Sequence, residues 1–156
     1  MKTEIGISEK HLHKNIDLLA ILLADEMTLY VKTRKFHWNV SGESFMELHK
    51  LFQSQYTELE ESIDEIAERI GKLGSKTIGT MKQFGELTRL KEWPDQYPKQ
   101  KGMMQELLED HETMIVELRK DIEACEQNKD AGTTDFLTGI MQQHETTAWV
   151  LRRYLN

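Results

Sequence analysis

Cysteine and proline are nearly absent from this chain of 156 residues. The single cysteine, Cys125, excludes an intrachain disulfide and a cysteine-rich metal knuckle, and its place on an apolar helical stripe predicts core packing. Two prolines, nine glycines and 30% charged residues leave few β-hairpin signals and are typical of long amphipathic helices. The length suits one hydrophobic core. We therefore expect a single all-α domain that spans residues 1–156.

The sequence also lacks a long apolar run and an excess of basic residues. The N-terminal stretch "MKTEIGISEK" has no apolar region of a signal peptide, and "LLAILLA" is too short to span a membrane. We expect a soluble, cytoplasmic protein with no membrane partner. The formal net charge of -7 excludes a generally basic surface that holds nucleic acid by neutralising phosphates, and it favours cations as partners.

Apolar residues recur at helical spacing in the first half of the chain. The first such segment predicts a helix from about Ser8 to Phe36, which the stretch "NVSGES" then interrupts. The second segment keeps the helical period from Phe45 to Leu73, and we expect Gly71 and Gly74 to end that helix.

Two more helices are predicted in the second half, with apolar stripes over residues 104–125 and 137–155. Both prolines lie in the connection from Ser75 to Lys101, where a short apolar pattern at Phe84, Leu87 and Leu90 predicts a small helix. Such a long connection can join parallel neighbours. The predicted architecture is therefore a ferritin-like four-helix bundle with a short helix in its long middle connection.

The histidines of the last two helices do not fit a common metal-binding pattern. Di-iron bundles carry a Glu-x-x-His pair on each of two helices. Here Leu108 precedes His111 by three residues, and Met141 precedes His144 in the same way. We expect His111 and His144 to be satisfied core or helix-cap histidines.

The second predicted helix has His49, Gln53, Asp64 and Glu68 on nearly one side. A rise of about 1.5 Å per residue separates Gln53 from Asp64 by roughly 16 Å, which is beyond the first shell of one ion. Two antiparallel copies across a twofold axis would bring a histidine end to each carboxylate end. His37 precedes the turn at Gly42, so it is expected beside His49.

A site of imidazole and carboxylate ligands suits iron(II), with zinc and manganese as the alternatives. The competing interpretation assigns no ligand role. Acidic runs such as "ELEESIDE" are usually solvated helix faces, and a His-Trp pair beside a turn often only packs.

Four stretches, "LYVKTRKFHWNVSGESFMELHKLF", "SIDEIAERIGKLG", "LLEDHETMIVELRKDI" and "HETTAWVLRRYL", resemble the Dps family, the mini-ferritins named for DNA-binding protein from starved cells. The resemblance covers nearly the whole chain. It implies a subunit of a hollow dodecamer that oxidises iron(II), with hydrogen peroxide or oxygen as oxidant, and stores an iron(III) mineral. Such a ferroxidase protects against peroxide and iron stress.

The resemblance also implies roles for particular residues. His37 and His49 would be ligands from one subunit and Asp64 and Glu68 from its partner, with Glu68 bridging two metal positions. Gln53 departs from the family, which usually has aspartate there, so the second iron position is expected to be weaker.

Two further features correspond to family features. Trp38 matches a tryptophan beside the site, where it donates an electron or simply packs. Glu126, Asp130 and Asp135 match the family's threefold pore region, where they would attract iron(II), although a solvated loop would look the same.

The rival function is a nucleoid-associated, DNA-compacting structural protein with a weakened metal site. Gln53 and the basic N-terminal residues Lys2, Lys10 and Lys14 are its support. Glu4 and Glu9 offset these lysines, and no lysine-rich tail follows the last helix, so DNA binding is not favoured.

Overall fold

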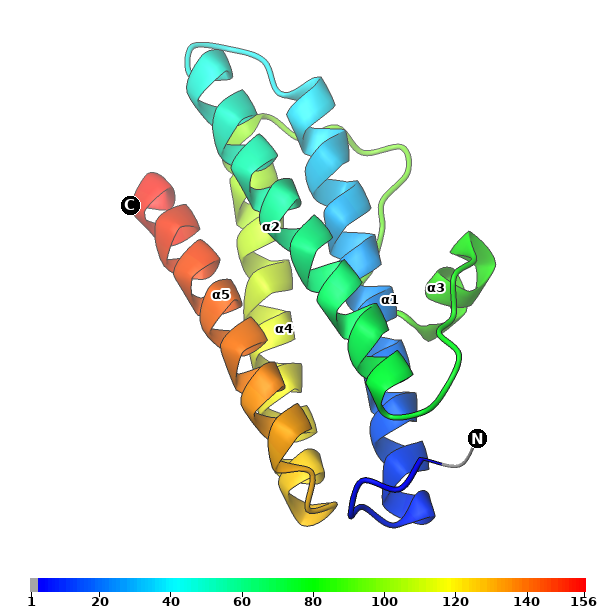
Figure 1. Cartoon of the computed structure of the whole chain (residues 1–156). Helices are drawn as coiled ribbons and strands as arrows, with labels where there is room; N and C mark the ends of the chain where they lie inside the picture. Colours follow the sequence, from blue (N-terminus) through cyan, green and yellow to red (C-terminus); the bar gives the residue numbers. More distant parts are fainter. Residues whose placement is uncertain (1–2) are drawn as a thin grey trace.

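The computed structural model describes residues 3–156, and within that range the chain forms five helices and no strand (Figure 1). The helices are α1 (Glu9–Asn39), α2 (Phe45–Lys72), α3 (Met81–Leu87), α4 (Gln100–Gln127) and α5 (Ala131–Leu155). Four of them are long, and the short α3 lies in the middle connection. The prediction of an all-α, four-helix bundle is confirmed.

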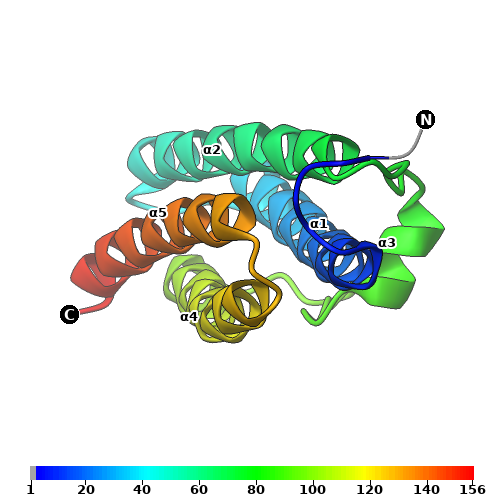
Figure 2. The same ribbon diagram turned by 60° about the horizontal axis from the view of Figure 1, so that its bottom comes forward.

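The long helices form two hairpins that pack into one bundle. α1 pairs with α2 and α4 pairs with α5, while α1 also contacts α4. The connection after α2 returns to the other end of the bundle, so α2 and α4 run parallel (Figure 1). Seen from one end, the four helices surround a common core and α3 lies outside against α1 (Figure 2). The predicted crossover between parallel helices is therefore present, but α2 and α4 are not neighbours: they lie diagonally across the bundle, and α2 packs on α1 and α5 instead.

The first helix begins as predicted and ends later. Ser8 caps α1 by accepting a hydrogen bond from the backbone N–H of His11 at 3.3 Å. The helix continues past Phe36 to Asn39. Its end is followed by Gly42, whose φ of +111° is in the region that favours glycine and lets the chain turn back into α2.

Gly74, and not Gly71, ends the second helix. Gly71 lies inside α2, which continues to Lys72. Gly74 has a φ of +95°, and a Cβ built there would collide with the side chain of Thr3. The prediction for Gly71 was wrong because only the residue after the last helical turn needs the left-handed conformation.

The core between the helices is mainly leucine, isoleucine, methionine and phenylalanine. Phe36 of α1 and Phe52 of α2 are almost fully buried, with ring centroids 6.5 Å apart. Cys125 is also fully buried, and burial, with Asp130 and Asp121 nearby, raises the pKa of its thiol to about 12. Core packing of Cys125 is confirmed, because the reactive thiolate is disfavoured there.

An ionic cluster fixes the middle connection to the bundle. Arg89, which follows α3, donates its backbone N–H and its Nε to the two carboxylate oxygens of the fully buried Asp25 at 2.5 and 2.7 Å. Its guanidinium also pairs with Asp121 and Glu117 of α4 at 3.1 and 3.2 Å. Burial raises the pKa of Asp25 although Arg89 opposes that change. Arg89 therefore ties the connection to both α1 and α4.

None of the helices within residues 3–156 combines the length and the apolarity needed to cross a membrane.

We predict that Arg89→Ala lowers the free energy of unfolding by about 3 kcal/mol, because it leaves the Asp25 carboxylate buried without a cation. Guanidinium denaturation at fixed protein concentration measures the loss. Lys82→Ala is the control, since the Lys82–Glu86 pair is exposed and 3.9 Å apart, and it should cost under about 0.5 kcal/mol. Adding Asp25→Asn to Arg89→Ala should cost less than the sum of the two; additive losses would contradict the pairing.

Candidate metal centre

His37 and His49 lie face to face where α1 ends and α2 begins. Their rings stack with centroids 3.7 Å apart. The Nδ1 of His37 is 2.7 Å from the backbone oxygen of His49, and the Nδ1 of His49 is 2.9 Å from the backbone oxygen of His37. The carbonyl of His37 is one of those that the end of α1 leaves without an intrahelical partner, so His49 also satisfies the helix terminus. The expected closeness of these histidines is confirmed.

The two hydrogen bonds fix the tautomer of both rings. A backbone carbonyl only accepts, so each Nδ1 must carry the proton and donate it. In a neutral ring, each Nε2 then has a free lone pair. Among residues 3–156, neither Nε2 has a hydrogen-bond partner. Metal-binding histidines are commonly oriented in this way, with the other ring nitrogen bonded to a carbonyl.

The three other predicted ligands lie on the exposed surface of α2. Gln53 and Asp64 are exposed, and Glu68 is 60% exposed and pairs with Lys72 at 3.5 Å. α2 is continuous, so Asp64 is roughly 16 Å from Gln53 along the helix axis. Within the described part of the chain, no three His, Cys, Asp or Glu side chains form a group that could hold a metal ion. The predicted ligands therefore lie in two separate groups within one chain.

Comparisons with known proteins agree with this fold. The family model described as the ferritin-like domain matches residues 16–156. A relative from Bacillus anthracis, DNA protection during starvation protein 2, is 40% identical over 141 residues, which are 90% of this chain and 96% of the relative. The chain belongs to the Dps family of ferritin-like proteins.

Solved structures of Dps proteins superimpose closely on this chain. DpsC from Streptomyces coelicolor has a TM-score of 0.96 at 27% identity, covering 100% of this chain and 91% of DpsC. The Dps protein of Vibrio cholerae O1 is described as a member of a broad superfamily of ferritin-like diiron-carboxylate proteins. Its TM-score is 0.90 at 26% identity, and the match covers 99% of this chain and 100% of that one.

Trp38 lies beside His37 in the sequence of this Dps chain, and its side chain is 64% exposed. Trp38 is therefore outside this chain's core, and both of its expected roles, electron donation and packing, stay predictions. Its neighbour His37 points inward instead and is only 8% exposed, in edge contact with the ring of Tyr56 at 5.2 Å. Trp38 is available only to a neighbouring molecule or to a species in solution.

The acidic residues near the last turn do not behave as one group. Asp130 is 1% exposed and caps α5 by accepting from the backbone N–H of Thr133 at 2.9 Å. Burial alone would raise its pKa, but bonds from Thr133 and Asn15 and the charge of Arg69 lower it. Asp130 is therefore structural, and the prediction that it lines a pore is wrong.

Glu126 and Asp135, on either side of that turn, are exposed. Their expected role in attracting iron(II) at a pore stays a prediction.

His111 and His144 are core residues, as expected, but only one is fully satisfied. Their Nδ1 atoms are 2.8 Å apart, and the Nε2 of His144 is 2.6 Å from a carboxylate oxygen of Glu26. The Nε2 of His111 has no partner although it is buried. No role was predicted for Glu26 from the sequence, although its spacing from Leu19 and Leu23 puts it on the core face of α1.

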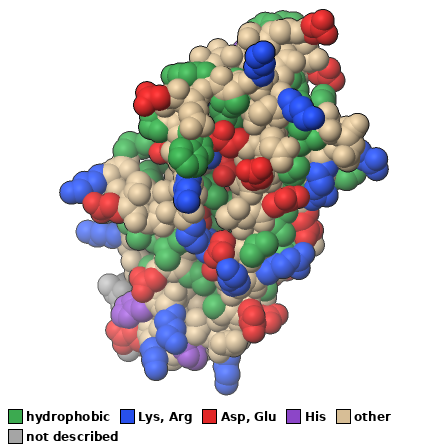
Figure 3. Space-filling view, turned by 180° about the vertical axis from the view of Figure 1, so that it is seen from behind, with side chains coloured by type: hydrophobic (Ala, Val, Ile, Leu, Met, Phe, Trp, Pro, Cys, Tyr) green, Lys and Arg blue, Asp and Glu red, His purple; other side chains and the backbone are tan. Residues whose placement is uncertain are grey.

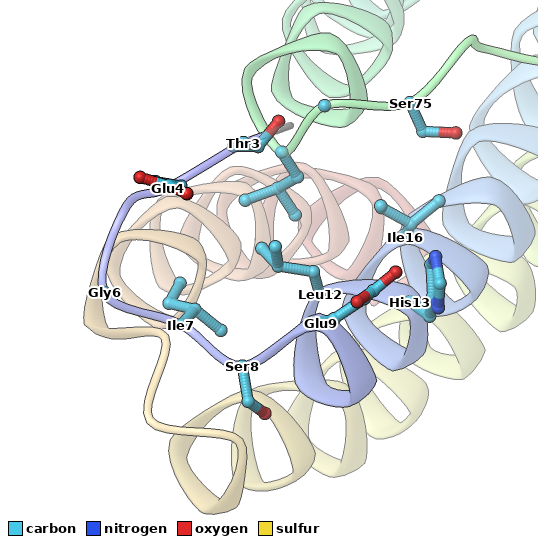
Figure 4. A pocket seen from close by; sticks show the side chains of 12 residues that line it. Thr3, Glu4, Gly6, Ile7, Ser8, Glu9, Leu12, His13, Ile16 and Ser75 are labelled. Atoms are coloured by element: carbon cyan, nitrogen blue, oxygen red, sulfur yellow. The ribbon is translucent and has the colours of Figure 1, made fainter. Parts of the chain in front are cut away.

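An open pocket of about 540 Å³ lies at the opposite end of α1 from His37. Figure 4 shows its walls: Glu9 and His13 on the first turns of α1, and Ser75 on the loop after α2. Its lining has one imidazole and no basic side chain, so it has neither a metal-ligand group nor an obvious anion site.

We predict that His49→Asn separates ligand chemistry from folding. The asparagine amide can replace Nδ1 as donor to the His37 carbonyl, while the Nε2 lone pair is lost. Zinc affinity measured by calorimetry should fall by about 10-fold or more, with an unfolding midpoint close to that of the unmodified protein. His49→Ala, which loses both functions, should also unfold at a lower temperature. Unchanged zinc affinity in His49→Asn would exclude this imidazole as a ligand.

Proposed function

We propose that this Dps protein is a ferroxidase that oxidises iron(II) between twofold-related subunits. The carrying observation is the pair of oriented imidazoles, His37 and His49, with two Nε2 atoms that no described side chain uses. In the proposed arrangement, two α2 helices lie antiparallel, and the partner's Asp64 and Glu68 supply the carboxylates. The helix rise supports this arrangement, because a second copy supplies the ligands that one chain holds too far away.

The donor set suits iron(II) as a substrate. Imidazole nitrogens and carboxylate oxygens together bind borderline divalent ions, and the two carboxylates favour the higher charge of the iron(III) product. We take hydrogen peroxide as the oxidant, with oxygen as the alternative. Two iron(II) ions give up two electrons, peroxide accepts them with two protons, and two waters form. Consuming iron(II) and peroxide together protects against both.

The storage part of the proposal rests on family membership. Twelve such subunits would enclose a cavity in which iron(III) is kept as a mineral. A cytoplasmic location is part of the same proposal. Zinc and manganese compete for the same ligands, so either metal should inhibit iron oxidation at this site.

DNA compaction is the less favoured function. The Bacillus anthracis relative is named for DNA protection, and Lys10 and Lys14 are exposed at the start of α1, whereas Lys2 lies outside the described residues. Against it, each subunit has a formal charge of -7, which an assembly multiplies. Acidic and basic side chains are also interspersed over the face in Figure 3, with no field of one sign.

We predict that Asp64→Ala with Glu68→Ala lowers the initial rate of iron(II) oxidation by about 100-fold or more, because loss of even an outer-sphere partner typically costs 10–100-fold. Absorbance of iron(III) in stopped flow measures the rate, and sedimentation shows the assembly. Glu61→Ala with Glu65→Ala is the matched control, with the same charge change on exposed positions of α2. A double variant that keeps the original rate would overturn the proposed site.

Gln53 provides a second prediction for this site. An aspartate would add a charged oxygen ligand one turn from His49, where glutamine offers only a neutral amide oxygen. Gln53→Asp should tighten the weaker iron position by about 10-fold and raise the oxidation rate at low iron. Anaerobic calorimetric titration with iron(II) compares the two proteins. Identical stoichiometry and affinity would mean that Gln53 has no influence on the second position.

A further inference from the structure

A second group of polar residues lies in the middle of the bundle, away from His37 and His49. Each long helix contributes one member: Glu26 from α1, Gln55 from α2, His111 from α4 and His144 from α5. Their exposed fractions are 0%, 4%, 2% and 3%. Residues of this kind are rarely so deeply buried without partners, and the proposed ferroxidase uses none of them.

A small hollow adjoins this group. It has a volume of about 10 Å³, and Gln55, His111 and His144 line it together with Ser62, Thr147 and Glu58 at its rim. A space of this size holds about one water molecule or one ion. The lining residues are mostly polar, and they include Glu58, an exposed residue of α2, so the hollow differs from an apolar packing defect.

Buried atoms beside the hollow lack partners. Both amide atoms of Gln55 and the Nε2 of His111 have no hydrogen bond among the described residues. In the His111 ring, Nδ1 contacts His144, and the other nitrogen, Nε2, is the one without a partner. Three polar atoms without partners beside one space indicate that the space has an occupant.

A chain of hydrogen bonds determines the state of His111. Burial, with His144 adding to it, holds the pKa of His111 well below its usual range, so this ring is neutral and has one N–H. In the arrangement in which His144 donates its Nε2–H to Glu26, the Nδ1 of His144 accepts from the Nδ1–H of His111. The Nε2 of His111 then has a free lone pair. This is the carboxylate–histidine support seen behind metal-bound imidazoles, extended by one ring.

We propose that the hollow binds one divalent transition-metal ion inside each subunit, with His111 Nε2 and the Gln55 amide oxygen as ligands and the Glu58 carboxylate at the rim as the third. An imidazole ligand favours zinc(II), iron(II) or cobalt(II) over magnesium or calcium. The ion would bring a positive charge into the same buried group as Glu26, whose Oε1 contacts His144 and whose Oε2 has no partner among the described residues. It links α2 to α4 and, through His144, to α5.

A single buried water is the competing occupant. It could donate to His111 Nε2 and to the Gln55 oxygen and accept from the Gln55 nitrogen, so it would satisfy the same three atoms. Charge separates the two, because a water brings no cation into the buried group that contains Glu26. The proposal does not depend on the ferroxidase proposal, since all three ligands belong to one chain.

The test uses zinc(II) as the probe and the assembled variant His37→Ala with His49→Ala as the background, so that the imidazole ligands of the interface are absent. We expect calorimetry to find one tight zinc per subunit in that background. Adding His111→Gln should remove it or weaken it by about 10-fold or more. His13→Gln, an exposed histidine at the other end of the bundle, is the matched control and should leave the stoichiometry unchanged.

A second variant and a direct measurement keep the test decisive if the His111→Gln variant does not fold. Gln55→Met keeps the volume and the histidine chain but removes the amide oxygen, and it should also weaken zinc by about 10-fold. Crystals of the unmodified protein soaked in zinc should give an anomalous peak between Gln55 and His111. The proposal would be overturned by the absence of a tight zinc in the background variant, by ligand variants that bind zinc as tightly as the background, or by a buried water only at that position.

Discussion

The rise of an unbroken α-helix, about 1.5 Å per residue, is the constraint on which the proposed chemistry of this protein depends. α2 is straight enough and long enough that its histidine end and its carboxylate end cannot meet around one ion. No change of rotamer removes a separation of roughly 16 Å. A second copy is the simplest source of the missing ligands. In the proposed ferroxidase the metal ligands and the subunit contact are therefore the same residues, and oxidation depends on assembly.

Two neighbouring residues of α1 illustrate how the bundle uses buried charge. Asp25 and Glu26 are both fully buried, but successive positions on a helix point about 100° apart. Asp25 turns outward to Arg89 and holds the middle connection, whereas Glu26 turns inward to His144. A buried polar group without a partner costs about 1–3 kcal/mol. Asp25 avoids that cost with a fixed guanidinium, and Glu26 has one oxygen that remains unpaired.

The sequence predicted what depends on periodicity and on short distances along the chain. The four long helices follow from apolar spacing, and the closeness of His37 to His49 follows from a five-residue turn between two helices. Asp130 was misjudged for a different reason. Whether an acidic residue after a helix caps the next one depends on neighbours such as Asn15 and Arg69, which are distant in sequence. Periodicity contains no information about those contacts.

The contact between the core histidines could not be predicted from the sequence, because it joins two different helices, α4 and α5. Leu108 and Met141 rule out a Glu-x-x-His pair, and that absence correctly excludes a dinuclear site built from two such pairs. It does not exclude a site whose carboxylate comes from α1 and acts through a second imidazole. The two proposed metal positions then differ in what they require. The position at His37 and His49 exists only in an assembled protein and is lost on dissociation, by mass action, whereas the position at His111 needs only a folded subunit. An ion held inside each bundle would stabilise the subunit before assembly, and an ion held between subunits would stabilise the assembly itself.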